Sequence, residues 1–311
     1  MSDLPLADAL QIGFITSAPN AEAARATAEL ADRLGYDSLW VGDHVAFAIP
    51  ILDPLLQLAQ LAAFSTRVRL GTSVYLLPLR HPVPTAKHIA TLDTLCNGRL
   101  IFGVGVGGEF PGEYTACGVP VKERGARLSE AIPLVRDLVR GETVTGSGRF
   151  YPFPETRLLP ASPQPDGPPI WCGGRSPGAL DRMGRMADGW VSYVVTPDMY
   201  RAGLESIAKA AEAAGRSLER FDTGHLLFVR LDDTREAALE NATTHLSRRY
   251  AMDFRKAADR YSALGRPEDV AERIHAFRQA GLRHVILDLV GPMGDRDEQL
   301  ERFATEVRPL L

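Results

Sequence analysis

The sequence predicts a closed (β/α)8 barrel of the TIM type, and three observations support this prediction. Eight short runs rich in β-branched and aromatic residues alternate with amphipathic stretches along the chain. Several of these runs are apolar on both faces, as strands of a buried parallel sheet must be. The length of 311 residues suits one such barrel. An open doubly wound sheet shows the same alternation with fewer strands, so the number of strands favours the barrel.

The expected strands and helices follow one another in strict order. Each strand is short, and the first helix ends at a glycine, Gly35, as helices commonly do. The expected strands are residues 10–16, 37–41, 68–75, 100–106, 169–173, 189–194, 223–230 and 284–290. The expected helices are residues 21–34, 54–64, 85–96, 123–140, 177–187, 199–214 and 267–280.

Two segments exceed the minimal repeat of strand and helix. Residues 141–168 are rich in proline and glycine, and we expect an extended excursion with a small hairpin. Residues 231–265, after the seventh strand, read as a helical insertion. We expect both segments to lie over the C-terminal rim of the barrel, where they would cap a pocket. Because the alternation resumes in phase behind residues 141–168, the chain, residues 1–311, is expected to form one domain.

Composition and charge exclude several classes of function. Lys and Arg total 35 against 39 Asp and Glu, a net charge of −4 that does not fit a nucleic-acid binder with a basic patch. No apolar run approaches the roughly 18 residues of a membrane helix. The first residues lack the basic and apolar regions of an export signal. The three cysteines, Cys96, Cys117 and Cys172, form no C-x-x-C motif. We therefore expect reduced thiols, a cytoplasmic location, and neither nucleic acid nor membrane as a partner.

Active sites of such barrels lie at the C-terminal ends of the strands, and an acid–histidine pair follows the second strand. Asp43 and His44 are open to three interpretations, namely an acid/base pair, two metal ligands or a polar cap on a turn. Further histidines at 81 and 88 read as the start and the outer face of a helix. No third ligand stands at a useful spacing, so we expect no metal site.

Glycines gather at the ends of the third and fourth strands. Gly71 indicates either a close backbone approach or an irregularity of packing. Residues 103–108 match G-x-G-x-x-G, but the following residues 109–112 (EFPG) are not expected to continue as a helix, which excludes a dinucleotide-binding fingerprint. The glycines leave this strand end without side chains. We therefore interpret it as a surface where a flat ring system lies against the backbone, with Glu109 beside the ring.

The end of the fifth strand combines a glycine pair with a strong helix start. Ser176 suits an N-cap, and a proline follows it at the first helical position. With Gly173, Gly174 and Arg175, these residues form either a phosphate cradle at a helix N-terminus or an ordinary turn.

Other chemistries find less support in the sequence. There is no G-x-S-x-G elbow and no Ser–His–Asp or Cys–His set that stands out. Paired carboxylates of a glycoside hydrolase remain open, although an aromatic content of 7% is low for a sugar-stacking cleft.

Seven segments of the chain carry a combined similarity to a known family. They are residues 31–44 (ADRLGYDSLWVGDH), 68–74 (VRLGTSV), 80–82 (RHP), 90–98 (ATLDTLCNG), 99–113 (RLIFGVGVGGEFPGE), 124–128 (RGARL) and 168–190 (PPIWCGGRSPGALDRMGRMADGW). Together, these segments resemble the luciferase-like family of flavin- and deazaflavin-dependent oxidoreductases. The resemblance spans roughly residues 10 to 290, and GTSV, the glutamate at 109 and GGRSP are most like the branch that uses coenzyme F420.

The resemblance implies a barrel, usually a homodimer, that binds the tricyclic ring at its C-terminal mouth. The Ser73–Val74 peptide would be a non-prolyl cis bulge behind the ring, and Glu109 would lie near the N1 and C2 side. Gly107 and Gly108 would give the ring and its tail room.

The resemblance also implies roles for the residues on either side of the ring. Asp43 and His44 would face the ring and the substrate, with His44 as proton donor or acceptor. The backbone amides of Gly173, Gly174, Arg175 and Ser176 would hold the phosphate of the cofactor.

The resemblance implies an F420-dependent oxidoreductase that moves a hydride between the deazaflavin and a small organic substrate. The alternatives are an FMN-dependent monooxygenase that uses reduced flavin, oxygen and a separate reductase, and a barrel that binds a ring without turnover. One departure concerns the substrate. The sugar-phosphate dehydrogenase of the F420 branch has a tryptophan shortly after its Asp–His pair, whereas residues 45–50 here are VAFAIP, with no set of lysines for a phosphate. Glucose 6-phosphate is therefore not the expected substrate.

Overall fold

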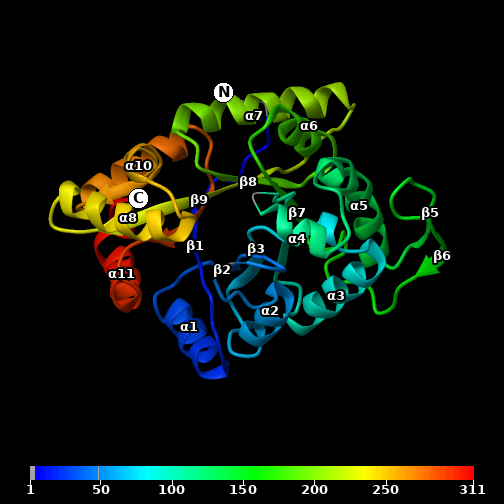
Figure 1. The fold of residues 1–311 in the computed structure, drawn as a ribbon, viewed down its shortest axis with the longest axis horizontal. Coiled ribbons are helices and arrows are strands. Elements are labelled where there is room, and N and C mark those ends of the chain that lie inside the picture. The colour runs from blue at the N-terminus through cyan, green and yellow to red at the C-terminus, as the bar shows by residue number, and fades with distance from the viewer. Residues whose placement is uncertain (1–3, 48, 109) are drawn as a thin grey trace.

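Eight parallel strands close into a ring that is surrounded by helices (Figure 1). The structure is a computed structural model that describes residues 4–47, 49–108 and 110–311. The last strand pairs with the first, which confirms the predicted (β/α)8 barrel. In order around the ring the strands are β1 (Gln11–Ile15), β2 (Ser38–Val41), β3 (Arg69–Thr72), β4 (Leu100–Val104), β7 (Ile170–Gly173), β8 (Gly189–Tyr193), β9 (Asp222–Leu231) and β11 (His284–Leu289).

All eight predicted strands and all seven predicted helices are present, with ends shifted by up to three residues. An eighth helix, α11, follows the last strand and was not predicted. The helices that follow the strands are α1 (Ala21–Arg33), α2 (Pro54–Ala62), α3 (Pro82–Leu95), α5 (Arg124–Val139), α6 (Pro177–Met186), α7 (Pro197–Ala213), α10 (Pro267–Gln279) and α11 (Arg296–Arg302).

Two tryptophans fill the barrel interior. Trp40 of β2 and Trp171 of β7 meet with ring centroids 5.2 Å apart, and both are buried. A Cβ atom at position 71 would lie 2.3 Å from the Trp40 ring, so Gly71 is required by packing inside the barrel. The hydroxyl of Ser38 accepts the Trp40 indole N–H at 2.7 Å and lies 2.7 Å from Nε2 of His284. The interior is thus packed rather than open, which leaves chemistry to the ends of the strands.

The insertion at 231–265 lies over the C-terminal rim, as predicted. It contains helices α8 (Arg235–Tyr250) and α9 (Arg255–Tyr261), and it ends in an unpredicted strand, β10 (Ala263–Gly265), which extends the edge of β9. Arg249, in the last turn of α8, forms a two-pronged ion pair with Asp288 at the end of β11, at 2.6 and 3.1 Å. This pair fixes the insertion to the mouth of the barrel.

The excursion at 141–168 forms the predicted hairpin but lies elsewhere. Strands β5 (Thr143–Gly146) and β6 (Phe153–Arg157) pair in antiparallel fashion outside α5 (Figure 1). The amide of Gln164 donates to the carbonyl of Leu100, at the start of β4. The expectation that this segment caps the C-terminal rim is therefore wrong. A segment between a helix and the next strand begins and ends at the N-terminal end of a parallel barrel, and this hairpin packs along the outer side from there.

Candidate active site

The ends of β2, β3, β4 and β7 bring most of the candidate residues to one side of the C-terminal mouth. Asp43 and His44 follow β2, Ser73 and Val74 follow β3, and Gly107 and Gly108 follow β4. These strands are neighbours in the ring, so the sequence motifs that carry the family resemblance meet in space.

His44 is held by a carboxylate that the sequence did not single out. Its Nδ1 lies 3.0 Å from Oε1 of Glu113, whose side chain is fully buried. The other oxygen, Oε2, accepts the backbone N–H groups of Val45 and Ala46 at 3.0 and 3.4 Å. Glu113 thus fixes both the imidazole and the loop that carries it. This contact favours a proton on Nδ1 and leaves Nε2 as the nitrogen that exchanges protons with a ligand.

Glu113 lies on a short helix, α4 (Pro111–Ala116), which includes two residues, Pro111 and Gly112, that were not expected to be helical. Proline interrupts a helix in its middle but suits its first turn, and Pro111 occupies that position. The expectation that the chain is not helical here is therefore wrong from Pro111 onward. The hydroxyl of Tyr114 donates to the carbonyl of Val106, which ties α4 to the end of β4. The available signal was the position of Glu113, which is the third residue of a helix that begins at a proline.

Asp43 has a different environment from its neighbour in sequence. Its carboxylate is buried and receives both Nη atoms of Arg80, at 2.5 and 2.9 Å, and the backbone N–H of Leu76 at 2.8 Å. Burial alone would lower the pKa of Arg80, but the hydrogen bonds and charge of Asp43 raise it above its ordinary value. Asp43 therefore holds Arg80 and the segment after β3 in place.

The Ser73–Val74 peptide is cis, as the family resemblance implies. The side chain of Val74 lies between two glycine positions, because a Cβ atom at Gly105 or Gly173 would come within 2.3 or 2.8 Å of its methyl groups. Because these glycines have no side chain, the bulge after β3 packs directly against the ends of β4 and β7.

The glycine pair after β4 has the left-handed backbone that favours glycine. Gly107 has φ +52° and is exposed, and Gly108 has φ +100°. A Cβ atom at Gly108 would lie 2.9 Å from Nε of Arg124, at the start of α5. The predicted site residue Glu109 lies outside the described residues.

The turn from β7 into α6 has the geometry of the predicted helix start. The hydroxyl of Ser176 accepts the N–H of Ala179 at 3.3 Å, and Pro177 begins the helix. Gly174, with φ +123°, Arg175 and Ser176 are exposed. The guanidinium of Arg175 donates to the carbonyl of Tyr193 at 3.1 Å, so the side chain turns along the rim toward the end of β8. The backbone at this helix N-terminus remains accessible to an anion.

Three further features bear on the alternatives. Among residues 4–47, 49–108 and 110–311, no group of His, Cys, Asp and Glu side chains has the arrangement of a metal site. Within the same ranges no helix is both long enough and apolar enough to span a membrane. Burial raises the pKa of Cys172, beside the mouth, to about 12, so this thiol does not serve as a thiolate nucleophile.

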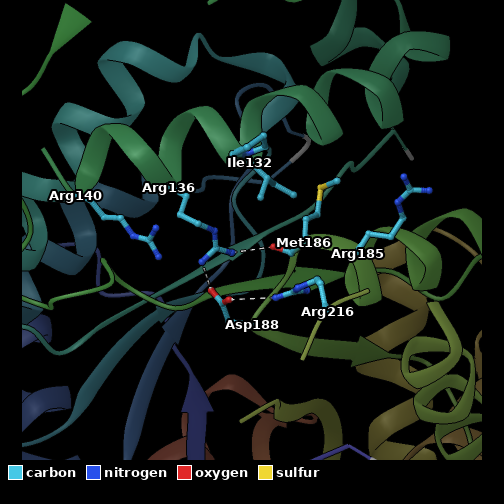
Figure 2. A pocket seen from close by; sticks show the side chains of 8 residues that line it. Ile132, Arg136, Arg140, Arg185, Met186, Asp188 and Arg216 are labelled. Carbon is cyan, nitrogen blue, oxygen red and sulfur yellow. Dashed lines mark hydrogen bonds and ion pairs between the residues drawn. The ribbon is translucent and has the colours of Figure 1, made fainter. Parts of the chain in front are cut away.

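A cavity of about 370 Å³ lies at the opposite end of the barrel, beside the start of β8 (Figure 2). Arg136 and Arg216 point toward Asp188 from two sides, at 2.8 and 4.0 Å (Figure 2). Arg136 also donates to the carbonyl of Met186, and Arg216 to those of Gly184 and Ala187. These arginines therefore serve the C-terminal carbonyls of α6, which is a structural task.

The fold and the arrangement of the mouth define a class of protein, and comparison with known families agrees. Residues 9–305 match the family model described as luciferase-like monooxygenase, so the chain belongs to this family. It is an enzyme of the luciferase-like oxidoreductases.

The similar proteins include one that is F420-dependent and one that is flavin-dependent. The chain is 30% identical over 315 residues to an F420-dependent glucose-6-phosphate dehydrogenase of Kineococcus radiotolerans, covering 90% of each chain. It is 36% identical over 151 residues to the oxygenase component of a flavin-dependent trigonelline monooxygenase of Acinetobacter baylyi, covering 48% of this chain and 42% of the other. Among solved structures, the monooxygenase RslO1 of Streptomyces bottropensis superposes with a TM-score of 0.82 at 26% identity, covering 96% of this chain and 99% of that one.

Proposed function

We propose that the protein is an F420-dependent oxidoreductase that transfers a hydride between the deazaflavin and a small organic substrate. The observation that carries the proposal is the His44–Glu113 pair at the C-terminal mouth, because it supplies a group that moves the proton accompanying the hydride. The full-length similarity to a dehydrogenase that uses F420 supports the choice of cofactor.

The described residues fit such a cofactor. The exposed helix start at Gly174, Arg175 and Ser176 would bind its phosphate through backbone amides and the positive end of the helix. Val74 would support the middle of the ring, and the exposed Gly107 would leave room beside it. From the family resemblance alone we also propose that Glu109 and Gly108 contact the ring. When bound, F420 supplies a carbon centre that accepts or donates a hydride and that reacts poorly with oxygen.

In the direction of alcohol oxidation, His44 would accept the hydroxyl proton of the substrate at Nε2, while the carbon that bears the hydroxyl would give up its hydride to the bound cofactor. The carboxylate of Glu113 holds the Nδ1–H group and stabilises the imidazolium that forms. In the reverse direction His44 returns that proton to the carbonyl oxygen. Asp43 takes no part in this transfer, because its oxygens are occupied by Arg80 and Leu76. It is a positioning residue for the segment that backs the ring.

The proposal is tested with purified protein, F420 and a panel of alcohols and carbonyl compounds, following the visible absorbance of the deazaflavin. We expect turnover in the wild type, and in His44→Ala a loss of turnover with unchanged affinity for F420. His88→Ala, on the exposed side of α3, is the matched control and should behave as wild type. Full turnover in His44→Ala would contradict the role of His44, and a protein that binds no F420 would contradict the proposed function.

The second candidate is an FMN-dependent monooxygenase on the same barrel. Its support is the similarity to a flavin-dependent monooxygenase over nearly half of the chain. Here the protein would depend on oxygen and on a separate reductase for its flavin. Oxygen consumption with reduced FMN, and none with F420, would favour this candidate.

A further inference from the structure

Exposed apolar side chains follow His44 closely in the sequence. Among the described residues, nine large hydrophobic side chains are exposed, and four of them lie within the twelve positions that follow His44. These four are Val45, Ile49, Leu52 and Leu56. Scattered exposed hydrophobic residues need no explanation, but a concentration next to a functional residue indicates a binding surface.

Two phenylalanines pack directly on the imidazole. Phe47 stacks parallel to His44 with ring centroids 4.0 Å apart and 5° between the planes. Phe110 meets His44 edge-on at 5.4 Å and Phe47 edge-on at 4.5 Å. Both phenylalanines are only partly buried. A ligand that reaches His44 therefore meets aromatic surface on the way.

The acidic side chains next to His44 already have partners. The segment from His44 to Leu52 contains no Lys, Arg, Asp or Glu. Asp43 is paired with Arg80, and Glu113 is bound by His44 and two backbone amides. A charged substrate would lose its hydration here without gaining an ion pair, which is unfavourable.

We propose that Phe47, Phe110, Val45 and Ile49 form an apolar wall that determines substrate specificity, and that the substrate is uncharged with an apolar body. This inference rests on the proposed function. In its simplest form a secondary alcohol lays its carbon chain on the apolar wall and its hydroxyl against His44. The C–H hydride passes to oxidised F420, the hydroxyl proton passes to His44, and a ketone remains.

A small molecule is a better occupant for the apolar wall than a second copy of the chain. Its two phenylalanines contact the proposed proton-transfer residue, and they come from the loops after β2 and β4, at the end of the barrel where such folds bind substrates. A protein surface covering these rings would also cover His44.

The test uses two homologous series of probes, uncharged primary amides of increasing alkyl length and the corresponding carboxylates. Their affinities for the protein, with and without F420, are measured by isothermal titration calorimetry. We expect amide affinity to rise about fourfold per methylene group over the first few carbons, and carboxylates of the same length to bind at least tenfold more weakly. Phe47→Ser should flatten the dependence on length. Leu159→Ser, at an exposed leucine of the excursion, is the matched control and should leave it unchanged.

The possible failures are distinguishable. If F420 binds but the amide affinities do not depend on chain length, the inference of an apolar wall is wrong and the proposed function is unaffected. No F420 binding, with a length dependence that Phe47→Ser abolishes, would remove the proposed function but keep a site for apolar ligands. If Ile49→Ser instead converts a dimer into a monomer and no probe binds, the surface is a protein interface and the inference is wrong.

Discussion

The two ends of the barrel both contain buried or half-buried carboxylates, but these face different partners. At the C-terminal mouth Glu113 meets an imidazole, and at the N-terminal end Asp188 meets the guanidinium of Arg136. An imidazole gains and loses a proton near neutral pH, whereas a guanidinium does not. The first pair is therefore able to move a proton, and the second only to hold helices and strands together. We therefore assign turnover to the C-terminal mouth and stability to the N-terminal end.

The largest effect is expected from Glu113→Gln at the mouth. An amide in place of the carboxylate no longer stabilises the imidazolium or fixes the proton on Nδ1, so turnover with F420 should fall about a thousandfold. The affinity for F420 should not change. Nitrogen NMR of labelled histidine should show the altered tautomer of His44, a signal that a merely structural role would not move. Glu236→Gln, on an exposed part of α8, is the control. Unchanged turnover in Glu113→Gln would contradict the assignment of turnover to the C-terminal mouth.

At the opposite end, Arg136→Ala should lower stability and leave turnover unchanged. It removes the hydrogen bonds to Asp188 and to the carbonyl of Met186. The free energy of unfolding should fall by about 2 kcal/mol, because the partly buried carboxylate loses a charged partner. Turnover per folded molecule should stay at the wild-type value. Urea unfolding and steady-state kinetics on the same preparation provide both numbers, and a loss of turnover without a loss of stability would contradict the comparison.

An effect that appears only as the pH falls is expected from two buried histidines of the barrel. Burial lowers the pKa of His225 and His284 from 6.5 to about 3. Below pH 6.5 these two histidines bind protons in the unfolded chain but not in the folded chain. Their contribution to the free energy of unfolding is therefore complete above that pH and is lost as the pH falls toward 3. Each histidine should contribute a slope of about 1.4 kcal/mol per pH unit.

Denaturant unfolding at pH 7, 6 and 5 measures this slope. His284→Gln should reduce it by the share of one histidine. His275→Gln, at a partly exposed position on α10, is the control. An identical pH dependence in wild type and His284→Gln would show that His284 is not held neutral in the fold.

The barrel could be predicted from sequence because its strands are short, apolar and regularly spaced, which are local properties. His44 could be placed at the mouth because it directly follows a strand. Its partner Glu113 could not, because their contact spans 69 residues and depends on a helix that begins at Pro111. The pairing of Asp43 with Arg80, 37 residues apart, is likewise a tertiary contact. Without it, Asp43 and His44 look equivalent in the sequence, although one is fixed in an ion pair and the other is partly exposed.

The central claim is that the mouth binds a deazaflavin for hydride transfer, and a paired fluorescence titration with F420 and FMN tests it most directly. We expect tight binding of F420 and much weaker binding of FMN, and we expect Gly174→Val at the start of α6 to reduce the affinity for F420. Tight binding of FMN with weak binding of F420 would contradict the account and make oxygen-dependent flavin chemistry the working model.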